Sequence, residues 1–166
     1  MINEVPIQQF YLLPYDRWEG YGAERAEILS FIRANHIANV IFLTTDTHAS
    51  LFNEVFIDRF TDPEPVAYEA VVGPIATFTF EQEIKRTVKD LELDEVGLDP
   101  DTAVDLFEGM LDLVGVDCHH LNTFSYGLVE VSADVGTATV TAKDDKGAVV
   151  KDQQQSSRAC TKIVGQ

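Results

Sequence analysis

Two side chains that commonly bind metal ions, Asp46 and His48, lie just after an apolar run at residues 40–43. The run predicts a buried strand, and the carboxyl end of such a strand is where α/β folds keep their sites. Residues i and i+2 of an extended backbone project to the same side, so both side chains can reach one cluster. Metal ions held there could neutralise phosphate oxygens and generate a nucleophile. Alternatively, the two residues only cap a strand-to-loop turn. Their spacing alone does not distinguish a metal site from such a cap.

Apolar periodicity predicts the strands that must hold this pair in place. Three strands are expected, over residues 37–43, 49–60 and 66–72. The first is expected to be the central strand, with both faces covered, and the third should pair beside it and end at Gly73-Pro74. The segment 4–13 is expected to be extended.

Helical periodicity predicts three helices, over residues 23–35, 81–91 and from 100 onward. The first should cover the sheet with Ile28, Phe31 and Ile32. The third begins at Asp99-Pro100, an N-cap residue followed by proline at the first helical position.

The C-terminal third of the chain has the pattern of an antiparallel β-sheet. Two strands are expected, over residues 124–131 and 138–143, with residues 144–147 turning directly into a third. The polar tail after Gln153 is expected to be loose.

Length and charge limit the class of protein. The chain has 166 residues, enough for one core, and its 28 acidic and 12 basic residues give a formal charge of −16. We expect a single unit over 1–166 of the α/β (α+β) class. An acidic surface repels nucleic acid, so no nucleic acid should bind through a basic patch, and the charge can equally serve solubility. No apolar run is long enough for a membrane span, and the N-terminal residues do not have the pattern expected of an export signal.

Four segments together resemble the C-terminal half of PhoD-like alkaline phosphatases, which belong to the calcineurin-like metallophosphoesterases. These segments are 5–10 (VPIQQF), 14–21 (PYDRWEGY), 43–48 (LTTDTH) and 122–127 (NTFSYG). The resemblance implies the C-terminal half of a metallophosphoesterase-type β-sandwich flanked by helices, with a C-terminal β-hairpin extension. It divides the unit into core residues 1–80, a helical segment 81–121 and a β extension 122–166.

The resemblance also implies a chemistry: metal-dependent hydrolysis of phosphate mono- or diesters, with Asp46 and His48 as metal ligands. Iron with calcium, or another divalent or trivalent set, is the implied cofactor, and the sequence does not select the metal. Relatives more often carry Gly-Asp-x-His here, and Thr45 replaces that glycine. Threonine disfavours a positive φ, so the backbone at Thr45 is in question.

The family's other metal ligands precede the segments that match, so the chain is expected to open in mid-domain. It should therefore be inactive alone. The parent family is extracellular or periplasmic. The alternative function is a non-catalytic half-domain acting through self-association or partner binding. Such a module should form a homo-oligomer through strand edges exposed at 40–43 or 66–72.

A second place for chemistry is the Asp16-Arg17-Trp18 segment. Arg17 could bind a phosphate in a bidentate manner and Trp18 could line a substrate cleft. The alternative is packing of Trp18 under the following helix, with Asp16 capping a turn.

The two cysteines, Cys118 and Cys160, could form a disulfide, and the resemblance to an exported family favours that pairing over two free thiols. The alternative is two unrelated small apolar side chains. A zinc site at Cys118-His119-His120 is disfavoured because adjacent residues point apart and no second ligand pair is nearby in sequence.

Overall fold

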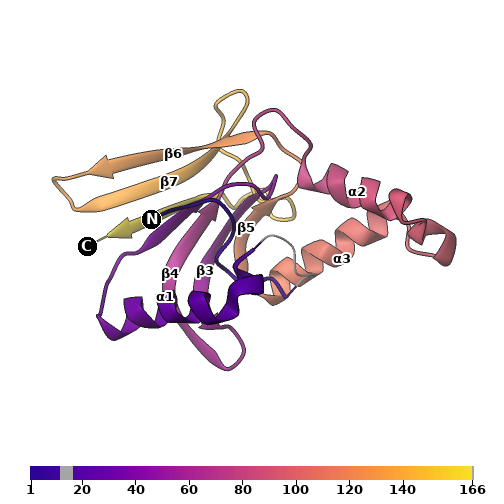
Figure 1. Cartoon of the computed structure of the whole chain (residues 1–166). Coiled ribbons are helices and arrows are strands. Elements are labelled where there is room, and N and C mark those ends of the chain that lie inside the picture. Colours follow the sequence, from indigo (N-terminus) through magenta and orange to yellow (C-terminus); the bar gives the residue numbers. More distant parts are fainter. Residues whose placement is uncertain (12–16, 166) are drawn as a thin grey trace.

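The computed structural model describes residues 1–11 and 17–165, which form two β-sheets and three α-helices (Figure 1). The expected turn cap Asp16 and the end of the extended segment, residues 12–13, lie outside the described residues. The larger sheet has the order β1-β2-β4-β3-β5, and the smaller has the order β6-β7-β8. This mixed architecture confirms the α/β (α+β) class.

The bounds of the elements follow. The larger sheet contains β1 (Ile2–Asn3), β2 (Ile41–Thr44), β3 (Ser50–Asp58), β4 (Asp62–Val71) and β5 (Val116–His120). The smaller contains β6 (Ser125–Ser132), β7 (Thr137–Asp144) and β8 (Thr161–Gly165). The helices are α1 (Gly22–Ala34), α2 (Phe80–Asp90) and α3 (Pro100–Leu113), with short 3₁₀ turns at Trp18–Tyr21 and Leu93–Val96. No helix within the described residues is long and apolar enough to cross a membrane.

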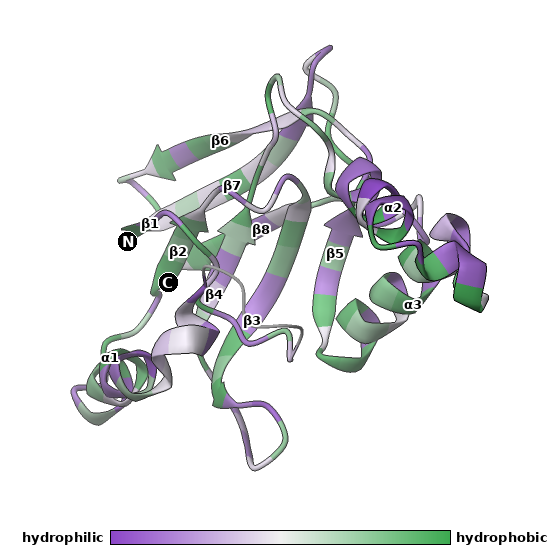
Figure 2. Ribbon diagram, turned by 45° about the vertical axis from the view of Figure 1, so that its right-hand side comes forward, coloured by the Kyte–Doolittle hydropathy of each residue, from purple (hydrophilic) through white to green (hydrophobic). Residues whose placement is uncertain are grey.

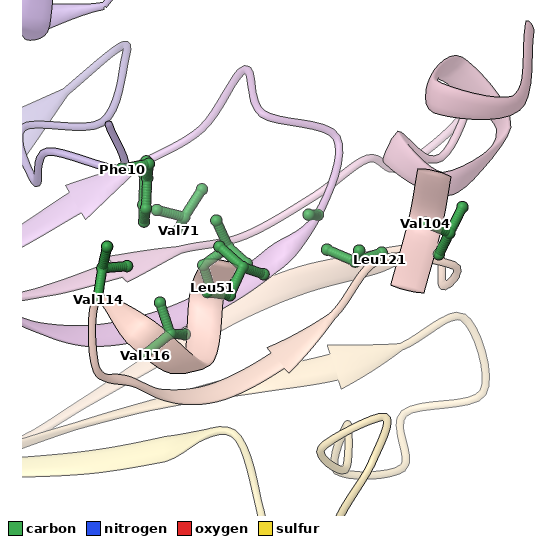
Figure 3. Packing of buried hydrophobic residues seen from close by; sticks show 9 residues of the cluster. Phe10, Leu51, Val71, Val104, Val114, Val116 and Leu121 are labelled. Carbon is green, nitrogen blue, oxygen red and sulfur yellow. The ribbon is translucent and has the colours of Figure 1, made fainter. Parts of the chain in front are cut away.

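The larger sheet is the middle layer of the molecule. Its side chains alternate between its two faces, and both faces are covered. On one face, Tyr68 and Phe52 pack with Val140 of the smaller sheet. On the other face, Leu51 and Val71 pack with residues of α3 and its flanking loops, as Figure 3 shows. The same face continues under α1, where Phe42 and Val55 meet Leu29 and Ile32. Figure 2 shows that β3 carries apolar residues over most of its length, as a strand covered on both faces does.

The face that α1 buries agrees with the prediction at Ile32 and in part at Ile28, which packs against the same cluster, and differs at Phe31. Arg25, Leu29 and Ile32 are buried, whereas Phe31, expected to cover the sheet, is 61% exposed. Residues at i, i+4 and i+7 form one stripe of a helix, and the buried stripe here begins with an arginine. The pattern of apolar residues does not reveal that Arg25 is buried, because its burial depends on carbonyl groups of segments distant in sequence.

The strand predicted at 37–43 begins only at Ile41, and it is not central: β2 lies between β1 and β4, and only alternate residues of it are buried. The pairing of β2 with β4 is as predicted, and the two strands are parallel. The expected free edges at 40–43 and 66–72 are wrong, because β2 and β4 each have a partner on both sides. The edge strands of the described sheet are β1 and β5, so the argument for self-association through β2 or β4 does not hold.

The C-terminal tail is ordered, contrary to the prediction. The chain does turn at residues 144–147, as predicted, and Val149 forms an antiparallel bridge to Lys143, but the third strand of the smaller sheet is β8, which pairs antiparallel with β7. Before β8, Cys160 forms a disulfide with Cys118 of β5, across 42 residues of sequence. The strand β5 was also missed, because its polar histidines do not give an apolar run. The order of this tail comes from long-range pairing, which a local polar composition does not reveal.

Candidate functional site

Asp46 and His48 lie in the turn that joins β2 to β3, beyond the carboxyl end of β2. Both have left-handed backbone conformations, with φ of 59° and 58° respectively. Thr45 does not have a positive φ, so the turn needs no glycine at that position. Thr45 is held instead by hydrogen bonds from its amide and its hydroxyl to the carbonyl of Glu4, at 3.3 and 3.4 Å. The left-handed conformation therefore falls on the two candidate ligands themselves.

Asp46 and His48 form a ridge between two cavities. The first, of about 390 Å³, is also lined by Arg17 and Glu83, and its wall is apolar, made by residues that include Val5, Pro6, Phe80, Ile84 and Val88. The second, of about 500 Å³, is lined on its other sides by residues that include Val72, Gly73, Ser125 and Tyr126. The two candidate ligands thus face a space that can hold a small ligand, with an arginine on the same wall.

His48 has an unusual environment for a partly exposed residue. Its Nδ1 atom is buried and has no hydrogen-bond partner among the described residues. The nearest carboxylate oxygen with which it forms an ion-pair contact is Oε2 of Glu83, at 3.7 Å. Sequence reasoning missed Glu83, because nothing in the local pattern of α2 distinguishes it from the other acidic residues of that helix.

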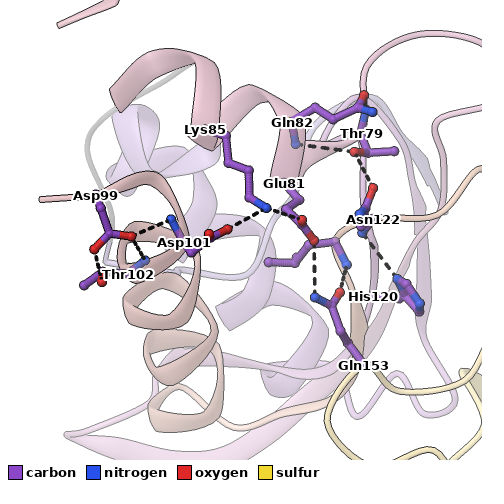
Figure 4. Close-up of polar contacts among 11 residues, drawn as sticks. Thr79, Glu81, Gln82, Lys85, Asp99, Asp101, Thr102, His120, Asn122 and Gln153 are labelled. Carbon is purple, nitrogen blue, oxygen red and sulfur yellow. Dashed lines mark hydrogen bonds and ion pairs between the residues drawn. The ribbon is translucent and has the colours of Figure 1, made fainter. Parts of the chain in front are cut away.

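The first turn of α2 is attached to the His48 turn through the backbone. The amide of Phe80 donates to the carbonyl of His48 at 2.8 Å, and the amide of Glu81 donates to the carbonyl of Leu121 at 3.0 Å. Thr79 is the N-cap and forms a capping box with Gln82. The Thr79 hydroxyl also donates to Oδ1 of Asn122 at 3.1 Å, as Figure 4 shows. These contacts fix where the side chains of α2 enter the first cavity.

We expect Thr79→Ala to lower the free energy of unfolding by about 1–2 kcal/mol, since it removes an N-cap oxygen and leaves Asn122 without its donor. Urea denaturation monitored by circular dichroism would measure the loss. Thr79→Ser keeps the oxygen and is the matched control, for which we expect a loss of less than half of that value. Equal losses in the two variants would show that the hydroxyl does not stabilise the helix.

A buried carboxylate, Glu69 of β4, connects this site to the N-terminal segment. Glu69 is fully buried and accepts hydrogen bonds from the amides of Ile7 and Gln8, at 2.9 and 3.1 Å, and from the Thr44 hydroxyl at 2.7 Å. Burial raises the pKa of Glu69, while these hydrogen bonds and the nearby Arg25 act in the opposite direction. Glu69 thus holds the segment that forms one wall of the cavity and the strand that leads to Asp46.

Arg25 of α1 holds the same segment from the other side. Its buried guanidinium donates to the carbonyls of Ile7, Phe56 and Ile57, with the last two bonds at 2.6 and 2.8 Å. Burial lowers the pKa of Arg25. Both ends of this polar network are therefore enclosed, and the N-terminal segment lies between them.

The structure brings Arg17 to the Asp46–His48 cavity but does not bring Trp18 there. Arg17 lines the first cavity and also a neighbouring one of about 400 Å³, which Trp18 lines. Trp18 packs against the buried cluster under α1, and its indole N–H donates to Oδ1 of Asn3 at 3.2 Å. Nη1 of Arg17 lies 3.8 Å from Oε2 of Glu19. Burial lowers the pKa of Arg17. These contacts suit Trp18 to packing and leave Arg17 on the wall shared with Asp46 and His48.

The donor set at the ridge fits part of a metal centre. A carboxylate and an imidazole are ordinary ligands for transition metals, and the unpartnered Nδ1 of His48 shows that this ring is not committed to another hydrogen bond. Within residues 1–11 and 17–165, no group of three or more histidine, cysteine, aspartate or glutamate side chains is placed to hold a metal ion. Cys118 forms a disulfide with Cys160, so its sulfur is not available to bind zinc together with His119 and His120.

Three comparisons relate the chain to known proteins. A family model described as PhoD-like phosphatase matches residues 3–113, which include Arg17, Asp46, His48 and Glu83. Alkaline phosphatase D of Bacillus subtilis (strain 168) is 40% identical over 43 residues, or 26% of this chain and 7% of that protein. A solved structure titled "Structure of PhoD" aligns with 93% of this chain and 30% of its own length, with a TM-score of 0.56 and 16% identity. The chain spans less than a third of that structure, and the likeness shows a shared fold.

Proposed function

This chain belongs to the PhoD-like phosphatase family, and from that membership we propose that it supplies Asp46 and His48 as metal ligands for the hydrolysis of phosphate esters. The observation that carries the proposal is that Asp46 and His48, just beyond the carboxyl end of β2, both line the two cavities, with Arg17 also lining the first. Phosphate ester hydrolysis needs positive charge near the non-bridging oxygens, and this wall offers a cation beside a metal-binding pair.

Each residue has a distinct role in this proposal. Asp46 and His48 would hold a metal ion, which when bound supplies Lewis acid and nucleophile chemistry. Arg17 binds and orients the phosphate oxygens through its planar guanidinium. The apolar wall that includes Phe80 and Ile84 excludes bulk water from the same cavity, which strengthens the attraction between Arg17 and an anionic substrate. The family is metal-dependent; iron with calcium, or another pair, is our proposal for the ions.

We further propose that this chain alone hydrolyses phosphate esters poorly or not at all. A two-metal centre needs a fuller set of ligands than two side chains, and the described residues offer no larger cluster. The remaining ligands must come from a polypeptide that matches the rest of the relatives' length. We also propose an extracellular or periplasmic location, which the disulfide supports because such bonds persist in oxidising compartments.

The test is metal content and turnover of a chromogenic phosphate ester, measured before and after mixing the chain with the N-terminal part of a related PhoD-like enzyme. We expect stoichiometric metal and activity only after mixing, with weak metal binding by the chain alone, and we expect Asp46→Asn and His48→Ala to abolish both. The matched controls are Asp105→Asn and His36→Ala, which change exposed residues of the same types away from the cavities. Full activity of the unmixed chain would contradict the proposed inactivity. No metal and no rescue would favour a non-catalytic half-domain that acts through a partner.

A further inference from the structure

We propose that Glu83 is a positioning residue for His48: its carboxylate accepts the Nδ1–H of His48 and leaves Nε2 free to bind a metal ion. The inference rests on the proposed function for its metal, but the hydrogen-bonded state of His48 can be measured without any metal. Glu83 lies on α2, 35 positions after His48 in the chain, and only the fold brings the two together.

The geometry at His48 calls for an acceptor. Nδ1 is buried and has no hydrogen-bond partner among the described residues, and a buried polar atom left in this state is destabilising. Oε2 of Glu83 is 3.7 Å away, slightly beyond hydrogen-bond distance. The Glu83 side chain is 54% exposed, so it can rotate to close that gap at little cost in packing. Contacts of this kind are often long before a ligand binds and shorten afterwards.

The position of Glu83 is set by the attachment of α2 to the His48 turn. The Phe80 amide donates to the carbonyl of His48 at 2.8 Å. This bond holds the first turn of α2 beside the His48 turn, and the side chains of Phe80 and Glu83, three residues apart on one helix face, both line the cavity that His48 lines. The capping box of Thr79 and Gln82 fixes the direction of the helix at that point.

The other charged groups that line this cavity or lie in the same turn of α2 are assigned to the metal, already paired, or cationic, and Asp46 is the one that the proposed function assigns to the metal. Glu81, in the same turn of α2, forms an ion pair with Lys85 at 2.8 Å and contacts Gln153. Arg17 lines the same cavity and is attracted to Glu83, but it cannot accept a proton from His48. Within the described part of the chain, Glu83 has no ion-pair contact other than the one to His48. Glu83 is therefore the acceptor that the structure makes available.

The chemical consequence concerns the tautomer of His48. A neutral imidazole carries one N–H, and the hydrogen bond that one nitrogen makes decides which nitrogen keeps a lone pair. A carboxylate at Nδ1 holds the proton there and leaves Nε2 as the metal-binding nitrogen. Such outer carboxylates typically contribute 10–100-fold to metal affinity.

The first test is the tautomer of His48, read from ¹⁵N chemical shifts and long-range ¹H–¹⁵N couplings of the whole chain at about pH 8.5, where histidine is ordinarily neutral. We expect the Nδ1–H form to predominate in the wild-type chain and the Nε2–H form to gain at its expense in Glu83→Ala. Asp90→Ala removes another exposed carboxylate of α2, one paired with Arg86, and should leave the tautomer unchanged. A wild-type His48 in the Nε2–H form, or a ratio unaffected by Glu83→Ala, overturns the proposal.

The second test is calorimetric titration of the same chains with Co²⁺ alone. We expect Glu83→Ala to weaken binding by about 10–100-fold and Asp90→Ala to leave it within about twofold. Binding that is lost in His48→Ala but unchanged in Glu83→Ala would overturn the role of Glu83 and leave the proposed metal site standing. No Co²⁺ binding by the wild-type chain would count against the proposed metal site, whereas the tautomer would still decide the role of Glu83.

Discussion

Replacement of Arg25 by methionine is expected to lower the free energy of unfolding by about 3–5 kcal/mol, the range seen when one partner of a buried charge network is removed. Methionine fills a similar volume but donates no hydrogen bond. The carbonyls of Ile7, Phe56 and Ile57 would then be left without the donor that Arg25 provides. The free energy of unfolding of domains of this size is about 5–15 kcal/mol, so the expected loss is a large fraction of it.

The measurement is urea denaturation followed by the fluorescence of Trp18, the only tryptophan, which packs against the same cluster as Ile7. Arg33→Met is the matched control on the same helix. Arg33 is partly exposed and is paired with Asp62, so its replacement should cost about 1 kcal/mol or less. Equal effects of the two substitutions would show that the buried network does not stabilise the N-terminal segment.

The loss in Arg25→Met should also depend on pH, because Arg25 opposes the effect of burial on Glu69. Without the arginine, the pKa of Glu69 in the folded chain rises further above its ordinary value of 4.5. A group with a raised folded-state pKa stabilises the fold below its unfolded pKa, and that stability is lost as pH rises through the folded pKa. The difference between Arg25→Met and the wild type should therefore widen as pH rises through the folded-state pKa of Glu69 in the wild type, which lies above its ordinary value of 4.5.

Removal of the disulfide in a Cys118→Ala/Cys160→Ala variant is expected to cost about 4 kcal/mol under the chain-entropy account of cross-links. The bond closes a loop between residues 42 positions apart, and both cysteines are buried between the two sheets. Its loss increases the freedom of the unfolded chain and removes the covalent attachment of β5 to the segment before β8.

Urea denaturation of the wild type, with and without a thiol reductant, and of the double variant measures this effect. We expect reduction to destabilise the wild type by an amount close to the substitution effect and to leave the double variant unchanged. Hydrogen exchange should show the largest loss of protection in β8 and in the 148–160 segment. A change below about 1 kcal/mol would indicate that non-covalent packing alone orders the tail.

Much of the local structure follows from short sequence patterns. The helix after Asp99-Pro100 begins as predicted, with the Asp99 carboxylate accepting from the amides of Asp101 and Thr102. The predicted hairpin of β6 and β7 is present, and β3 falls within the predicted range 49–60. Capping residues, proline position and alternation act over a few residues, so the sequence reveals them directly.

Position within the sheet could not be read in the same way. The apolar run at β2 predicted a central strand, yet β4 is the middle strand of the order β1-β2-β4-β3-β5. The tail was expected to be loose, yet β8 pairs with β7 over five residues of register. Strand order depends on which distant segments pair, and composition carries little of that information.

The sequence by itself determined the family resemblance, the strand-to-turn position of Asp46 and His48, and the starts of two helices. Only the tertiary structure placed Glu83 beside His48 and Arg17 on the same wall as both. It alone also enclosed Glu69 with the amide of Ile7, 62 residues away in the chain. The physical reason is that backbone patterns act between neighbours in sequence. A buried charge or an unpartnered imidazole nitrogen is defined by the groups that folding brings next to it.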